Sequence, residues 1–194
     1  MLQPKKNRPF RDPKLLWSRA GRLFIGERLW LDTARTLAVC LQKPALSNTW
    51  WPIAATDFEN INSQDVARVL ALWLNSTFGV ISLIAARVDT RGPWVELKKP
   101  VVEGIPVLDA SVLTNRQRTK CLAAYQDIAD KELKPLPEID KDIARASIDD
   151  VFSQAFGFSG DLAVLRRILA EEPLVVGART IPTPASVGLF SVSA

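Results

Sequence analysis

The longest hydrophobic pattern in this chain begins near residue 63 and continues to residue 86. Its first half repeats at helical spacing, with apolar residues at Val66, Val69, Leu70, Trp73 and Leu74. Asn62 or Ser63 can cap the start of this helix, and the positions from 69 to 86 carry no charge. The pattern predicts one long helix that is buried on most of its sides.

An uncharged run of this length also raises the alternative of a membrane span, because about 18 to 20 apolar residues cross a bilayer. Asn75, Ser76 and Thr77 interrupt the run, and no second apolar run accompanies it. We therefore favour a buried helix without membrane contact, whose polar step faces a partner element. The same three residues match a glycosylation acceptor, which we interpret as chance because no secretory signal precedes it.

Strand patterns lie on both sides of this helix. Residues 22–31 alternate between two faces, and residues 33–41 are rich in small and branched side chains, so both segments predict strands. Lys43 and Pro44 are expected to end the second strand. The adjacent Trp50 and Trp51 point to opposite faces of an extended segment, where packing is favoured over stacking on a base.

The pattern changes from strands to helices after the central run. Residues 89–93 predict a sharp turn, and residues 94–99 predict a strand that ends at Pro100. Three amphipathic patterns then predict helices at 115–133, 143–156 and 161–170, with Gly157 ending the second and Ser159 capping the third.

This order of elements predicts an α+β fold: a small β-rich recognition core with a long buried helix, followed by a C-terminal helical subdomain. We expect a basic flexible arm at 1–14, an α+β core at 15–112, a helical subdomain at 113–172 and a tail at 173–194. No apolar segment follows the basic arm in the way that a signal peptide requires, so a cytoplasmic location is expected.

The composition narrows the chemistry that this chain can perform. The sequence contains no histidine, which removes the commonest general base and the metal sites that depend on imidazole. Cys40 and Cys121 are far apart in segments predicted as strand and helix, so we expect buried free thiols rather than a disulfide or a metal site. No metal is therefore expected.

The formal net charge is only +4, but the charges are unevenly distributed. Basic residues are concentrated in the N-terminal arm and around the predicted turn and the helix after it, whereas residues 127–150 are predominantly acidic. The second basic group comprises Arg87, Arg91, Lys98, Lys99, Arg116, Arg118 and Lys120. This separation suits a surface that faces phosphates, and ordinary solvated charge is the alternative.

The central region also resembles a known family. A helix with Leu74-Asn75-Ser76, the pair Lys98-Lys99 and the step Ile105-Pro106 are similar to the target-recognition region of restriction-modification adenine-specific DNA methyltransferases. This resemblance, to the type I and fused type II systems, covers about residues 15–135. It implies a fragment or subunit that contacts double-stranded DNA and docks on a catalytic methyltransferase domain or subunit.

The motifs that such enzymes use for catalysis are missing from this sequence. Members of the family carry a glycine-rich loop for S-adenosylmethionine and an Asn-Pro-Pro-Tyr-type motif for the flipped adenine. This chain has no Pro-Pro pair, and its nine glycines form no G-x-G loop. We therefore expect no catalytic residue and no cofactor in this chain, with S-adenosylmethionine bound only by a partner domain.

The candidate DNA-binding residues are Arg87, Arg91, Trp94, Lys98, Lys99, Arg116, Arg118, Lys5, Lys6 and Arg8. Their cations would neutralise phosphates, and the turn at 89–93 could offer side chains to base edges. Asn75 is chemically able to read adenine, but its place in an apolar helix favours a structural polar role, together with Ser76.

Two alternatives from other functional classes stay open. The first is a protein-interaction or assembly module that makes no contact with nucleic acid and uses its basic arm to bind an acidic partner. The second is a small enzyme that uses acidic side chains as acid and base, with Asp140, Asp142, Asp149 and Asp150 as the available groups. These acids lie in the predicted helical subdomain, where solvated faces are the usual explanation.

Overall fold

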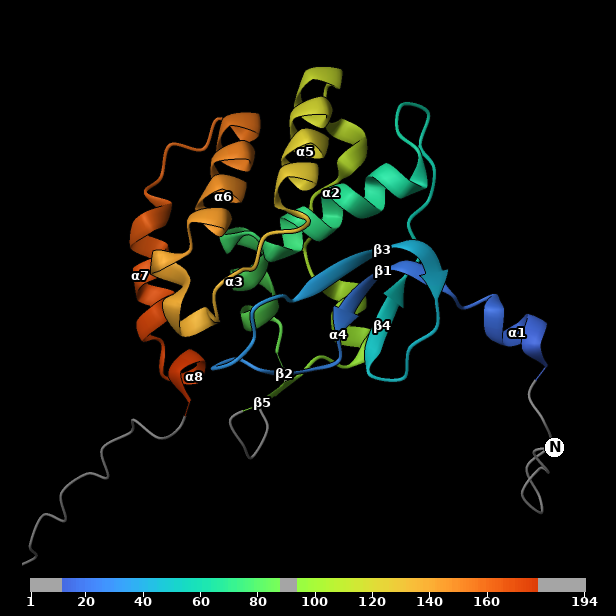
Figure 1. Ribbon diagram of the computed structural model, residues 1–194, viewed down its shortest axis with the longest axis horizontal. Helices are drawn as coiled ribbons and strands as arrows, with labels where there is room; N and C mark the ends of the chain where they lie inside the picture. The colour runs from blue at the N-terminus through green and yellow to red at the C-terminus, as the bar shows by residue number, and fades with distance from the viewer. Residues whose placement is uncertain (1–11, 88–93, 178–194) are drawn as a thin grey trace, which may run out of the picture.

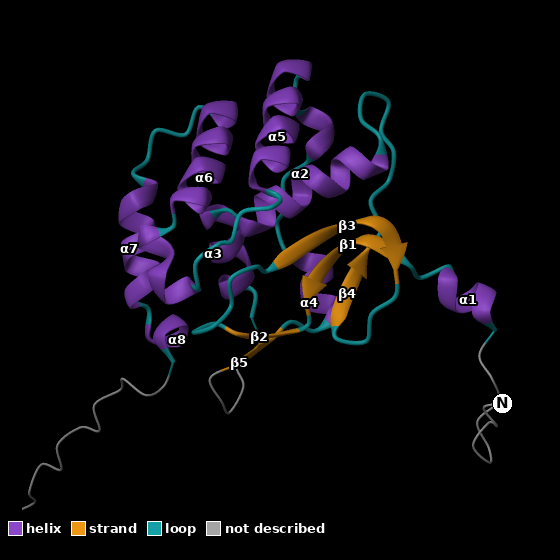
Figure 2. Ribbon diagram, in the orientation of Figure 1, coloured by secondary structure: helices purple, strands orange, loops and turns teal. Residues whose placement is uncertain are grey.

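The computed structural model describes residues 12–87 and 94–177. Its strands are β1 (Gly21–Gly26), β2 (Arg28–Trp30), β3 (Ala38–Ala45), β4 (Trp50–Ile53) and β5 (Trp94–Glu96). Its helices are α1 (Pro13–Trp17), α2 (Ser63–Asn75), α3 (Thr77–Ala85), α4 (Lys99–Gly104), α5 (Asn115–Ile128), α6 (Ile143–Phe156), α7 (Leu162–Glu171) and α8 (Pro173–Val176). Two 3-10 helices are η1 (Ala110–Val112) and η2 (Leu136–Lys141). About 52% helix and 16% strand, in small sheets with several helices, confirm the α+β class (Figure 2).

The strands form two small antiparallel sheets rather than one. The first has the order β3-β1-β4, and the second is a two-stranded ribbon of β2 and β5. The strand predicted over 22–31 is therefore interrupted at Glu27, and its two halves pair with different partners. Gly26 permits this change of direction, since a Cβ at Gly26 would lie 2.6 Å from a methyl carbon of Leu29.

The second predicted strand lies later in the chain than its pattern indicates. β3 begins at Ala38 and continues through Lys43 and Pro44, so the expectation that this pair ends the strand was wrong. Because β3 is an outer strand with a register shift opposite β1, a residue without an N–H is tolerated there.

The lysine-bearing segment is also only partly extended. β5 ends at Glu96, and the chain turns into α4, so the strand predicted up to Pro100 was too long. Lys98 is the N-cap residue of α4, and Pro100 occupies its first turn, where a fixed φ favours a helix and no N–H is needed.

The long central helix is in fact two helices joined at Ser76. The axes of α2 and α3 differ by 76°, and Ser76 between them has an extended backbone. Its hydroxyl accepts a hydrogen bond from Gly79 N at 3.2 Å and so caps α3. Gly79 is required by the close approach of the two helices, since a Cβ there would lie 2.4 Å from the Trp73 carbonyl oxygen. Among the described helices, none alone has the length and apolarity of a membrane span; only this bent pair does when it is taken together.

Helix α2 is nevertheless the centre of the fold. In Figure 1 it runs between the three-stranded sheet and the helices α5 and α6, and it contacts both. Ala67, Ala71 and Leu74 face the core that includes β1 and β3. Val66 and Val69, on another face, belong to the core shared with α5 and α6. Burial on several sides is therefore as predicted, and the small alanines let the sheet approach closely.

The three predicted later helices correspond in approximate position to α5, α6 and α7, whereas the short helices α4 and α8 were not predicted. Helix α5 ends at Ile128, earlier than predicted, and α6 ends at Gly157 in the left-handed conformation expected of a C-terminal glycine. Helix α7 is capped by Asp161 rather than Ser159. Cys121 is buried and Cys40 half-buried, and both are free thiols.

Candidate nucleic-acid interface

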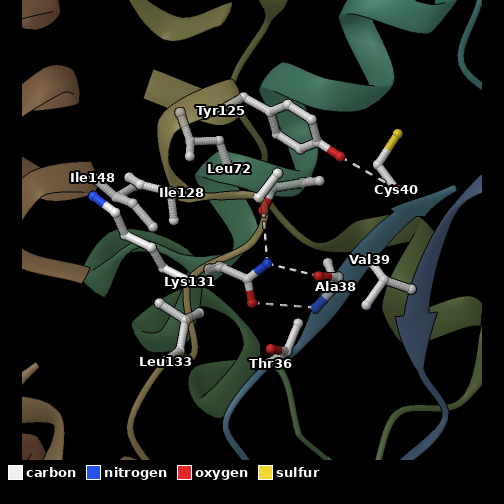
Figure 3. Close-up of a pocket in the computed structure, with 13 residues that line it drawn as sticks. Thr36, Ala38, Val39, Cys40, Leu72, Tyr125, Ile128, Lys131, Leu133 and Ile148 are labelled. Atoms are coloured by element: carbon white, nitrogen blue, oxygen red, sulfur yellow. Dashed lines mark hydrogen bonds between the residues drawn. The ribbon is translucent and has the colours of Figure 1, made fainter. Parts of the chain in front are cut away.

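Asn75, the polar residue at the end of α2, has a structural role in the fold. Asn75 is only 7% exposed, and its amide makes four hydrogen bonds with backbone groups. Its oxygen accepts from Leu37 N and its nitrogen donates to the carbonyl oxygens of Ala38, at 2.6 Å, and Ala71. The Asn75 amide both accepts from Ala38 N and donates to Ala38 O, as the backbone of a paired strand would (Figure 3). An amide bound in this way has no group left to read a base.

The break between α2 and α3 is held by two charged residues of α6. Arg145, fully buried, donates to the carbonyl oxygens of Asn75 and Arg35. Asp149 accepts hydrogen bonds from the backbone N and the hydroxyl of Thr77, at 2.7 and 2.6 Å. The cation therefore lies at the C-terminus of one helix and the anion at the N-terminus of the next, as the helix dipoles favour.

The electrostatics of this buried cluster follow from its isolation from water. Burial raises the pKa of Asp149, although Thr77 and an ion pair with Arg166 favour the carboxylate. Burial likewise lowers the pKa of Arg145, although Asp142 opposes this change. The cluster is closed, and its charges bind one another and the backbone, so we interpret it as structural.

A cavity of about 210 Å³ lies between β3, α2 and α5 (Figure 3). Thr36, Cys40, Tyr125 and Lys131 contribute polar groups to its wall. The Tyr125 hydroxyl donates to the Cys40 carbonyl oxygen at 3.3 Å, and burial raises the pKa of the Cys40 thiol. The cavity is smaller than the roughly 300 to 1,000 Å³ typical of sites for small molecules. We assign no ligand to it.

The structure places the predicted DNA-binding residues in two separate regions. Lys98 and Lys99 are exposed at the start of α4, and Trp94 begins β5. Arg116 and Arg118 lie at the start of α5, which is at the opposite end of the molecule from β5 in Figure 1. The second basic group therefore does not form one continuous surface.

The remaining candidates are distributed differently. Arg87 is half-buried after α3 and donates to the Ile84 carbonyl oxygen at 2.9 Å. Lys5, Lys6, Arg8, Arg91 and the turn at 89–93 lie outside the described residues.

Lys99 lines a groove that the sequence did not predict as a whole. The groove has a volume of about 720 Å³, and its wall also includes Arg19, Glu27, Trp50 and Trp51. We call the surface formed by these four residues and Lys99 the tryptophan groove. The Trp51 ring is fixed by a hydrogen bond from its Nε1 to the Leu97 carbonyl oxygen at 2.6 Å. Adjacent tryptophans were a visible signal, but their proximity to Lys99 arises from tertiary packing.

A second surface lies on the β2–β5 ribbon, and residues 97–99 connect β5 to Lys99 in the groove. The outer face of the β2–β5 ribbon carries Arg28, Trp30, Trp94 and Glu96, and we call it the ribbon face. The guanidinium carbon of Arg28 lies 5.0 Å from the centre of the Trp94 ring, and Arg28 also pairs with Glu96 at 3.3 Å. Trp30 is 54% exposed. The sequence had singled out Trp94 but neither Arg28 nor Trp30.

The described residues bring cations and aromatic rings together in these two adjoining surfaces. Within residues 12–87 and 94–177, no group of three or more cysteine and acidic side chains is placed to hold a metal ion. When this chain was compared with models of known protein families, with curated proteins and with solved structures, no match was found.

Proposed function

We propose that this chain is a DNA-binding target-recognition fragment or subunit of an adenine-specific DNA methyltransferase. The observation that carries the proposal is the tryptophan groove, in which Arg19 and Lys99 lie beside the half-buried rings of Trp50 and Trp51. Cations next to aromatic rings on a grooved surface are a combination that nucleic-acid-binding proteins use repeatedly. The motif resemblance of the helix and the Lys98-Lys99 pair supports the same proposal.

The groove would act mainly on the sugar-phosphate backbone. Lys99 and Arg19 supply positive charge, and Lys98 extends it along the exposed start of α4. Two acids partly offset this charge: Glu27, half-buried in the groove wall, and Glu103, which pairs with Lys99 at 3.5 Å. Backbone contacts position a protein on DNA, and base contacts then specify the sequence. In this proposal, S-adenosylmethionine and the catalytic residues belong to a partner domain, and the complex acts in the cytoplasm.

The proposal is tested by binding to a labelled random duplex across a series of salt concentrations. We would compare the wild-type chain with Lys98→Ala/Lys99→Ala. Each lysine that contacts a phosphate contributes about one unit to the slope of log affinity against log salt. The double variant should therefore bind more weakly and show a slope that is smaller by about one to two units.

The matched control is Lys131→Ala/Lys141→Ala, which removes the same charge from exposed positions after α5 and in η2. It should keep the wild-type slope. If both double variants reduce the slope equally, the effect is one of net charge, and the groove is not the interface. If the folded wild-type chain does not bind duplex even at low salt, the proposal is wrong.

One observation favours the assembly module as a second candidate. Phe156 and Phe158 are 46% and 42% exposed at the edge of an aromatic cluster. The Phe158 ring meets Phe78 edge-on at 5.3 Å, and Phe78 stacks on Trp73 at 5.3 Å. Exposed aromatic rings on a rigid cluster are common in protein interfaces. This candidate gains support if the folded chain binds no DNA and Phe156→Ala/Phe158→Ala abolishes association with a partner protein.

A further inference from the structure

The β2–β5 ribbon holds its outer side chains on a rigid support. Leu29 and Val95 alternate with the outer residues and are buried in the main core. The next residues along the chain, Leu31 and Leu97, are buried in the same core. Trp30 is paired in register with Trp94 at the end of the ribbon. The exposed Trp30 ring is therefore mounted on a backbone that is anchored on both strands.

The two tryptophans of the ribbon face have different surroundings. Arg28 lies over the Trp94 ring in a cation–π arrangement and pairs at the same time with Glu96. Trp30, by contrast, exposes 54% of its surface although its own backbone oxygen is bound by Thr33 N and Ala34 N. The exposed Trp30 ring is therefore accessible to a partner, and its anchored backbone holds it in place before binding.

The charge around Trp30 indicates what kind of partner that is. Glu96, the acid on the ribbon face, is already paired with Arg28. Continuing the alternation of β5, the exposed Lys98 follows Trp94 and Glu96 on the same side, because its backbone is still extended. Since Glu96 neutralises Arg28, Lys98 supplies the uncompensated positive charge on this side. A cation beside an exposed indole suits a nucleic-acid strand, in which negative phosphates alternate with flat bases.

We propose that Trp30 is a stacking platform for an unpaired nucleotide of a DNA strand, with Lys98 on a neighbouring phosphate. The inference rests on the proposed function and specifies the form of DNA that the ribbon face takes. In a fully paired duplex both faces of each base are covered by its neighbours, so an indole face can stack only on a base that has left the helix. The tryptophan groove, which adjoins the ribbon face at Lys99, contacts the backbone of the paired region.

The test compares three labelled DNAs: a single strand, its fully paired duplex, and the same duplex with one bulged nucleotide. Trp30→Leu removes the ring but keeps an apolar side chain of similar exposure, and Trp30→Phe restores a smaller ring. Trp30→Leu should lower affinity for the single strand and the bulged duplex by about tenfold, which is within the range for one stacked base. Trp30→Phe should recover most of that loss.

Affinity for the fully paired duplex should change less than about twofold in Trp30→Leu, because stacking requires an unpaired base. The salt slope should be unchanged on all three DNAs, since the substitution leaves the charge unaltered. Phe156→Leu, at an exposed ring on α6, is the control and should bind all three DNAs as the wild type does. Thermal unfolding of each variant checks that the chain remains folded.

Several results would overturn this inference. An equal loss on all three DNAs, or no loss on the single strand and the bulged duplex, excludes a platform for unpaired bases. Self-association of the wild type that disappears in Trp30→Leu would assign the ring to a protein interface instead. These results are distinct from failure of the proposed function, which depends on the salt slope of Lys98→Ala/Lys99→Ala on the paired duplex.

Discussion

The substitution Asp149→Ala tests whether the junction of α2 and α3 depends on a carboxylate from a distant helix. Asp149 is buried, and it accepts the backbone N and hydroxyl of Thr77 while it pairs with Arg166. Alanine removes all of these contacts at once. It also leaves the Thr77 donors and the Arg166 guanidinium without their acceptor in a region closed to water.

The magnitude follows from the contacts that are lost. A hydrogen bond to a charged group contributes about 1.5 to 3 kcal/mol, and loss of one partner of a buried ion pair costs about 3 to 5 kcal/mol. These two estimates overlap because they describe the same carboxylate. We expect Asp149→Ala to lower the free energy of unfolding by about 3 to 5 kcal/mol. Asp149→Asn, which keeps an acceptor for Thr77, should cost less.

The assay is equilibrium unfolding of the whole chain in urea, followed by far-ultraviolet circular dichroism. Asp150→Ala is the matched control, since it removes the neighbouring carboxylate from an exposed position of the same helix. It should change the free energy of unfolding by less than about 0.5 kcal/mol. If Asp149→Ala is within about 1 kcal/mol of the wild type, the junction does not depend on this carboxylate and the reasoning is refuted.

Three further predictions follow from burial and close approach. Because burial raises the pKa of Asp149, the folded chain binds this proton more tightly than the unfolded chain, whose Asp has a pKa of about 3.9. The free energy of unfolding of the wild type, relative to that of Asp149→Asn, should therefore increase as the pH falls through the raised pKa. A constant difference from pH 3 to pH 7 would contradict this. Gly79→Ala should lower the free energy of unfolding by about 1 to 3 kcal/mol in the same urea assay, since the alanine Cβ would clash with the Trp73 carbonyl oxygen. A variant as stable as the wild type would show that α2 and α3 can move apart. Burial raises the pKa of Cys121 to about 11, so this thiol has little reactive thiolate at pH 8. Alkylation at pH 8, measured by mass spectrometry, should therefore be roughly a hundredfold slower in the folded chain than in urea. Equal rates would show that the site opens readily.

Local patterns in the sequence were enough to predict many single elements. The end of α6 at Gly157 and the burial of Cys121 were predicted correctly, and the cap of α2 is Asn62, one of the two residues proposed for it. Asn75 also has the buried backbone contacts of a structural amide. The α+β class follows from the order of these elements. Such features depend on helical spacing, caps and hydrophobicity, which act over a few neighbouring residues.

Contacts between distant residues decided the rest. The break at Ser76 is completed by Asp149, which is 72 residues from Thr77 along the chain, and no local pattern shows that a carboxylate will reach that position. The change of sheet at Glu27 likewise depends on which strand becomes available for pairing. The neighbours of Lys99 in the tryptophan groove and the exposure of Trp30 follow from that packing. Local sequence indicated the approximate positions of most helices and the types of residue available, whereas tertiary contacts set the breaks and ends of several elements and brought the candidate residues onto adjoining surfaces.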